Sequence, residues 1–91
     1  MDIIYKKRFR GKTTDLIRLS AETGYPIVAV DAWWIRIYAD KLGIKIPRPI
    51  SIWDIKSGEI KPDGKVLVDN LEYVIKHLTS LDIDTATLSS E

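Results

Sequence analysis

The sequence predicts a single α/β domain over residues 1–91, arranged as a three-layer αβα sandwich around a four-stranded parallel sheet. The chain has 91 residues, of which 45% are apolar and 30% charged, a composition typical of one globular domain. Short apolar runs alternate along it with segments of helical periodicity. Parallel strands joined through helices need right-handed crossovers, and these place helices against the faces of the sheet.

The first half of the chain predicts two strand–helix units. Their elements are a strand at residues 2–5, a helix at 13–22, a strand at 27–30 and a helix from 32 to about 42. The first strand is a short β-branched and aromatic run, and the second is apolar throughout, as in a strand buried on both faces. Asp31 offers an N-cap oxygen to the second helix, and Gly43 is suited to end it.

Residues 50–55 allow two interpretations. Ser51, followed three residues later by Asp54, favours a capped helical turn, whereas Ile50 and Ile52 favour the start of a short strand. The other elements predicted in the second half are a polar surface loop at 57–64, a strand at 65–69, a helix at 71–81 and a strand at 84–88.

Several classes of protein are excluded by composition. The chain has no cysteine, which excludes disulfides and thiolate metal sites, and a single histidine, His77, cannot form an imidazole zinc site alone. No apolar run approaches the roughly 18 residues that a membrane span needs. We therefore expect neither secretion nor a membrane partner, and a cytoplasmic location, which for a viral protein is the host cytoplasm.

Positive charge is concentrated near the beginning of the chain. Residues 1–20 contain six Lys or Arg and two acids, for +4, whereas residues 21–91 contain eight and eleven, for −3. Five of the cations lie within residues 5–12, directly before the first predicted helix. Such a cluster is typical either of a solvated charge run or of a site for an anion, and the charge alone does not favour one of them.

Two motifs point to phosphate chemistry. The first is Gly11-Lys12-Thr13-Thr14, which lies between a predicted strand and the start of a predicted helix. Backbone N–H groups at the start of a helix, with a lysine beside them, suit the binding of phosphate. The second is the apolar run 66–68 ending in Asp69. Ligands of parallel α/β sheets bind at the carboxyl ends of the strands, which is where both motifs are expected.

Together the two motifs resemble the Walker A and Walker B segments of the P-loop NTPases. The order of elements resembles that family over nearly the whole chain, and within it the chain looks most like small bacteriophage-type proteins similar to truncated helicase cores. Two positions depart from the pattern: Lys6 stands where the first glycine of the phosphate loop belongs, and Asn70 follows Asp69 where hydrolytic members can have a glutamate. The family's topology implies the strand order 1-4-3-2, with the last strand in the interior of the sheet.

The resemblance also implies a ligand, ATP or another nucleotide together with Mg²⁺. It assigns Mg²⁺ to Thr13 and Asp69, and little or no hydrolysis follows, because Asn70 can position a water but cannot accept its proton. Phosphate binding is assigned to Arg8, Arg10, Gly11, Lys12, Thr13 and Thr14.

A second unusual feature is the aromatic helix at residues 32–42. Ile35, Tyr38, Ala39 and Leu42 form one apolar face suited to packing on a sheet, which leaves Trp33 and Ile37 turned away from it and Trp34 at its edge. Exposed tryptophan is typical of contact surfaces. The alternatives are packing of Trp33 over Ile44 and Ile46 or beneath a terminal segment, and stacking on nucleic-acid bases.

Three functions remain open from the sequence. The first is a nucleotide- or phosphate-binding accessory or regulatory protein with little or no hydrolysis. The second is a degenerate P-loop scaffold, natural or engineered, that binds or inhibits a protein, or self-associates, through Trp33, Trp34 and Ile37. The third is nucleic-acid binding through the basic loop, which the overall charge of +1 disfavours.

Overall fold

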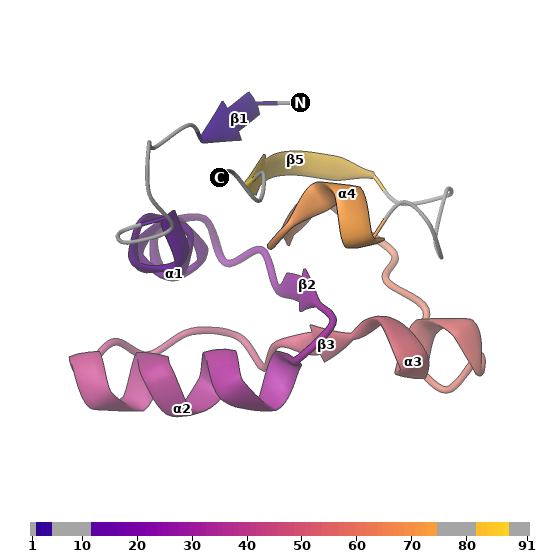
Figure 1. The fold of residues 1–91 in the computed structure, drawn as a ribbon, viewed down its shortest axis with the longest axis horizontal. Helices are drawn as coiled ribbons and strands as arrows, with labels where there is room; N and C mark the ends of the chain where they lie inside the picture. The colour runs from indigo at the N-terminus through magenta and orange to yellow at the C-terminus, as the bar shows by residue number, and fades with distance from the viewer. Residues whose placement is uncertain (1, 5–11, 75–81, 88–91) are drawn as a thin grey trace.

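The computed structural model describes residues 2–4, 12–74 and 82–87 (Figure 1). Within these ranges the backbone follows the predicted alternation of strands and helices. The elements are β1 (Asp2–Ile4), α1 (Lys12–Thr23), β2 (Ile27–Ala29), α2 (Ala32–Leu42), β3 (Ile50–Ser51), α3 (Ile52–Lys56), β4 (Val66–Val68), α4 (Leu71–Val74) and β5 (Ile83–Thr87). The predicted residues Arg8, Arg10, Gly11 and His77 lie outside the described part of the chain.

The strands form one parallel sheet in the order β1-β5-β4-β2-β3. In Figure 1, β1 and β5 lie at the top of the view, and β2 and β3 lie below them, near α2 and α3. The observed order differs from the predicted 1-4-3-2 of a four-stranded sheet because β3 adds a fifth strand beyond β2; the four predicted strands themselves lie in the order β1-β5-β4-β2. The interior position predicted for the last strand is observed, since β5 pairs with β1 on one side and with β4 on the other.

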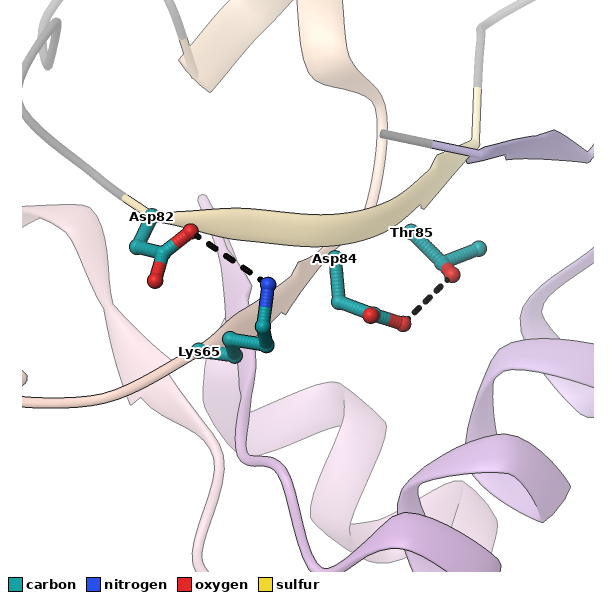
Figure 2. Close-up of polar contacts among 4 residues, drawn as sticks. All are labelled: Lys65, Asp82, Asp84 and Thr85. Carbon is teal, nitrogen blue, oxygen red and sulfur yellow. Dashed lines mark hydrogen bonds and ion pairs between the residues drawn. The ribbon is translucent and has the colours of Figure 1, made fainter.

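The register between β4 and β5 shifts by one residue. Val66 pairs with Ile83 but Leu67 pairs with Thr85, so that Asp84 is the extra residue of β5. The Thr85 hydroxyl donates to Oδ2 of Asp84 at 2.9 Å, as Figure 2 shows. Because of this shift, Ile83 and Ala86 pack against the same group of core residues although they are three positions apart.

One ion pair lies at the amino ends of the same two strands. Lys65 Nζ lies 3.8 Å from Asp82 Oδ1, in the residues directly before β4 and β5 (Figure 2). Both side chains are largely solvent-exposed, so the pair stabilises the fold by at most about 1 kcal/mol.

The core consists of two clusters that use alternate residues of the strands. Since successive strand side chains point to opposite faces, Val28 belongs to one cluster while Ile27 and Ala29 belong to the other. The α1–α2 cluster contains Leu16, Ile17, Ile27, Ala29, Ile35, Ala39 and Leu67. The α3–α4 cluster contains Val28, Ile50, Ile52, Val66, Val68, Leu71, Val74 and Ala86.

The ends of α2 lie where the sequence predicts them. Asp31 accepts a hydrogen bond from the Trp34 amide at 3.2 Å, which confirms the N-cap. Gly43 has a φ of 71°, and its N–H donates to the Asp40 carbonyl at 3.1 Å while that of Ile44 donates to the Ala39 carbonyl at 3.1 Å. These two bonds form a Schellman motif, which closes the helix.

Burial along α2 differs from the prediction at its last residue. Ile35 and Ala39 are buried, and Tyr38 packs against the α1–α2 cluster, as expected. Leu42 instead is 38% exposed. Beyond the helix, Ile44 and Ile46 pack against the cluster, so that this part of the core is filled by the returning chain rather than by Leu42.

Both interpretations of residues 50–55 prove correct in turn. Ile50–Ser51 pairs with β2 as β3, and the Ser51 hydroxyl then accepts from the Trp53 amide at 3.2 Å, as the N-cap of α3. Ile55 packs against the α3–α4 cluster, but Trp53 is 52% exposed, with Lys56 Nζ 5.7 Å from its ring centroid. Across the described ranges no helix has the length and apolar character needed to span a membrane.

Candidate functional site

The predicted Mg²⁺ ligands Thr13 and Asp69 belong to segments that begin or end toward the carboxyl edge of the sheet. Because all strands are parallel, Asp69, directly after β4, lies at this edge. The last residue of α1 is Thr23, shortly before β2 begins at Ile27, so α1 ends at the opposite edge. Its 12 residues span about 18 Å. The first turn of α1, with Thr13, therefore lies toward the same edge as Asp69.

Asp69 is held in place by the neighbouring strand. Its Oδ1 accepts a hydrogen bond from the Thr87 hydroxyl at 3.0 Å, and its backbone N–H donates to the Val28 carbonyl at 3.0 Å. Oγ1 of Thr87 also accepts from the Asn70 amide at 2.8 Å. Thr87 is fully buried at the end of β5, whereas Asp69 is half-buried. The carboxylate at the end of β4 is thus fixed by a hydroxyl that itself has two bonds.

Thr87 is the residue of this site that sequence reasoning missed. Its role depends on the pairing of β4 with β5, in which Val68 is the partner of Ala86. The only sequence signal is a β-branched hydroxyl residue near the end of a predicted interior strand. That signal points to a contact with Asp69 only once the strand order is known.

Asn70 has a backbone conformation that accounts for its identity. Its φ is 57°, in the left-handed region, where asparagine is one of the few residues other than glycine found regularly. Its carbonyl accepts from the Val74 amide at 3.3 Å at the start of α4. The turn between β4 and α4 therefore explains why this residue is asparagine. This explanation does not involve catalysis.

The predicted phosphate-loop residues are described only in part. Lys12 is the first residue of α1, and its side chain lies outside the described portion. Thr13 is half-buried in the first turn. The Thr14 hydroxyl lies 3.0 Å from that of Tyr38, so it joins α1 to α2. For Thr14 a phosphate contact remains a prediction that competes with this interhelical hydrogen bond.

The oxygen atoms of two predicted residues toward this edge are of the type that binds magnesium. The Thr13 hydroxyl and the Asp69 carboxylate offer oxygen, which Mg²⁺ prefers. Among the residues that the structure describes, no three His, Cys, Asp or Glu side chains gather into a metal cage. Mg²⁺ bound with nucleotide commonly takes one or two protein ligands and completes its coordination with phosphate oxygens and water. The Thr13 hydroxyl and the Asp69 carboxylate are oxygen ligands of the type that such a magnesium ion takes from a protein.

The outer side of α2 presents the two predicted tryptophans to solvent. Trp33 is 72% exposed and Trp34 is 49% exposed, whereas Ile37 is half-buried. The Trp34 ring stacks on that of Tyr38, with centroids 5.1 Å apart and planes at 21°. Ile44 and Ile46 do not cover Trp33, since they pack against the α1–α2 cluster. Trp33 instead borders a small cavity beside Pro49 and Asp54.

Two adjoining cavities follow the same helix. The larger, of about 430 Å³, lies between α2 and residues 44–49, and the smaller, of about 190 Å³, lies between the start of α2 and residues 48–54. Arg36, Arg48 and Pro49 line both of them. We call this pair of cavities the α2 groove. Sequence reasoning did not identify it, and the prolines on either side of Arg48 are its only sequence signal.

No family model, curated protein or solved structure matches this chain. The likeness to P-loop NTPases therefore rests on two segments of the sequence, residues 11–14 and 66–69, and on their place in the order of elements. The proposals below concern two places in the described part of the chain, the carboxyl edge and the α2 groove.

Proposed function

We propose that the protein binds a nucleotide or another phosphate compound at the carboxyl edge of its sheet, in a three-layer, P-loop-like fold. The observation that carries this proposal is the hydrogen bond that fixes Asp69 to Thr87, at the edge toward which α1 begins. A carboxylate held in place at the edge toward which a helix begins suits a cation that accompanies phosphate. The two core clusters, built from alternate strand residues, support the layered arrangement.

Each residue of the proposed site has a role in this proposal. The amide of Gly11 and the side chain of Lys12 bind phosphate, and the hydroxyls of Thr13 and Thr14 assist them. Arg8 and Arg10 reach the outer phosphates. Thr13 and Asp69 hold Mg²⁺, which when bound neutralises phosphate charge. Thr87 positions Asp69.

The proposed activity is binding with little or no hydrolysis. Asn70 follows Asp69, and an amide cannot take the proton of an attacking water. Because its left-handed φ favours asparagine, a glutamate at this position would cost about 1 kcal/mol or more of backbone strain. A small accessory or regulatory protein of the bacteriophage type, which signals by binding phosphate rather than by turning it over, fits these properties.

Thermal unfolding with ligands tests this function. We expect ATP, ADP, GTP or inorganic phosphate at millimolar concentration, with Mg²⁺, to raise the Tm of the wild-type chain. At 100 times Kd, binding adds about 2.7 kcal/mol, and each 1 kcal/mol raises the Tm of a domain of this size by about 4–8 °C. Lys12→Ala should abolish the rise, whereas Lys61→Ala, an exposed loop substitution, should retain it. A rise that is absent, or that Lys12→Ala leaves intact, contradicts the proposal.

A second candidate function is protein binding through α2. The observation that favours it is the exposure of Trp33, 72%, next to the half-exposed Trp34. Large aromatic side chains on one helix are typical of contact surfaces that hold a partner or a second copy of the chain. In this function the P-loop-like fold is a degenerate scaffold, natural or engineered, and Trp33, Trp34 and Ile37 contribute the contact. Nucleic-acid binding is the third candidate and depends on the basic residues at 5–12.

A further inference from the structure

The α2 groove is an open surface with an apolar floor. Pro49 and Ala39 are buried, Ile44 and Ile46 are half-buried, and all four line the larger cavity. Trp33 lines the smaller cavity and leaves most of its ring exposed there. The floor therefore offers a row of apolar contacts that ends at an aromatic side chain, which suits large apolar side chains of a ligand.

The rim of the groove carries three cationic side chains. Arg36 and Arg48 line both cavities, and Lys45 lines the larger one; all three are exposed. Within the described ranges, none of their side chains takes part in an ion pair or hydrogen bond. Two guanidinium groups on one rim match a carboxylate, which arginine binds through two parallel N–H donors.

Two acids of the groove restrict the charge of the ligand. Asp40 lines the larger cavity and Asp54 the smaller one, so three cations face two carboxylates. A nucleic-acid backbone, with a phosphate at every residue, would bring several of its charges against these acids. A peptide with one or two carboxylates among apolar side chains avoids this repulsion and still meets the arginines.

We propose that the α2 groove binds an acidic, apolar peptide segment of a partner protein, with its carboxylate between Arg36 and Arg48 and its apolar side chains on the floor that ends at Trp33. This inference rests on the second candidate function, protein binding through α2, and names the chemistry of the partner. The 11 residues of α2 extend over about 16 Å, the length of about five residues of an extended peptide. The interaction does not depend on nucleotide at the carboxyl edge.

Selection from a random library of displayed 12-residue peptides on the full chain tests the proposal. We expect enrichment of sequences that combine Asp or Glu with Leu, Ile, Phe or Trp. An enriched peptide, labelled for fluorescence anisotropy, should bind the Arg36→Glu, Arg48→Glu double variant about tenfold more weakly or worse. The same peptide with Lys in place of its acids should show the reverse preference and bind the double variant more tightly than the wild type.

Control variants separate this proposal from its alternatives. Arg18→Glu changes an exposed charge on α1, outside the groove, and should leave peptide binding unchanged. Circular dichroism should show the wild-type spectrum for each variant, as evidence that it is folded. Trp33→Ser should weaken binding, because it removes an exposed apolar contact and leaves the core intact.

Four results would overturn the proposal, and they have different consequences for the candidate functions. Enriched peptides that lack acids but depend on Trp33 would refute the acidic partner and leave protein binding intact. No enrichment at all would refute both. Displacement of the peptide by a twelve-nucleotide oligothymidine would identify the groove as a nucleic-acid site. A mass that rises with protein concentration and falls in the double variant would identify a second copy as the occupant.

Discussion

The Thr87 hydroxyl is the residue-scale feature on which the candidate phosphate site depends. It donates to Asp69 and accepts from the Asn70 amide, while its side chain is excluded from solvent. A buried N–H without an acceptor costs about 1–3 kcal/mol. Two adjacent residues at the end of β4 therefore take their positions from one side chain of β5.

Replacing this hydroxyl by a methyl group tests its role. Thr87→Val keeps the shape of the side chain but leaves the Asn70 amide without its acceptor, so we expect the free energy of unfolding to fall by about 1–3 kcal/mol. Thr85→Val is the matched control on the same strand, because among the described residues the Thr85 hydroxyl bonds only the half-buried Asp84. It should cost less than about 1 kcal/mol. Urea unfolding followed by circular dichroism measures both, and equal losses would show that Thr87 has no special role.

Single residues of the site were predictable in type but not in arrangement. The sequence predicts Asp69 because an apolar run ends at this acid. It also shows that Asn70 stands where a hydrolytic P-loop protein can have a glutamate. The left-handed φ of Asn70 and the hydroxyl of Thr87 follow from the turn and from the pairing of distant strands. No local pattern specifies contacts between residues 17 or 18 positions apart.

Among the elements, α2 shows how far local signals extend. Its N-cap Asp31 and its closing Gly43 act within one turn of the chain, so the sequence predicted both ends correctly. The exposure of Leu42 was not predictable from periodicity, because Ile44 and Ile46 take up the adjacent core space. Residues 50–56 show the same limit, since a two-residue strand leads directly into a five-residue helix.

The end of α2 yields a prediction at the scale of the element. A Cβ added to Gly43 would meet nothing within 4 Å, so Gly43→Ala suffers only from its left-handed φ of 71°. We expect a loss of about 1 kcal/mol in the free energy of unfolding. Gly64→Ala is the control, because its Cβ also meets nothing within 4 Å and its φ lies outside that region. It should be neutral or stabilise by up to about 1 kcal/mol. If thermal and urea unfolding show equal effects of both substitutions, the αL closure of α2 contributes nothing measurable.

At the scale of the molecule, the strand alternation was predictable and the α2 groove was not. The resemblance to P-loop proteins predicted the interior position of the last strand. The strand at residues 50–51 was one of two interpretations of that segment and was absent from the predicted sheet, because two residues carry no periodic signal. The α2 groove could not be foreseen, since it forms only where residues 44–54 return along α2. A phosphate site at the carboxyl edge and a peptide groove beside α2 would use different parts of this fold.

The interior position of β5 leads to a prediction about the whole chain. Truncation after residue 81 removes β5, which pairs with both β1 and β4. Among the described strands, β1 then has no partner and β4 pairs with β2 alone. Thr85, Ala86 and Thr87, all buried, leave with it. Small domains are stable by only about 5–15 kcal/mol, so we expect loss of an interior strand to unfold the chain. We therefore expect residues 1–81 to lack a cooperative thermal transition and a dispersed amide NMR spectrum.

A chain of residues 1–87, which retains β5, should show both. Cooperative unfolding of the shorter chain would mean that β1 and β4 remain folded without β5. The interior position of β5 in the sheet would then be contradicted.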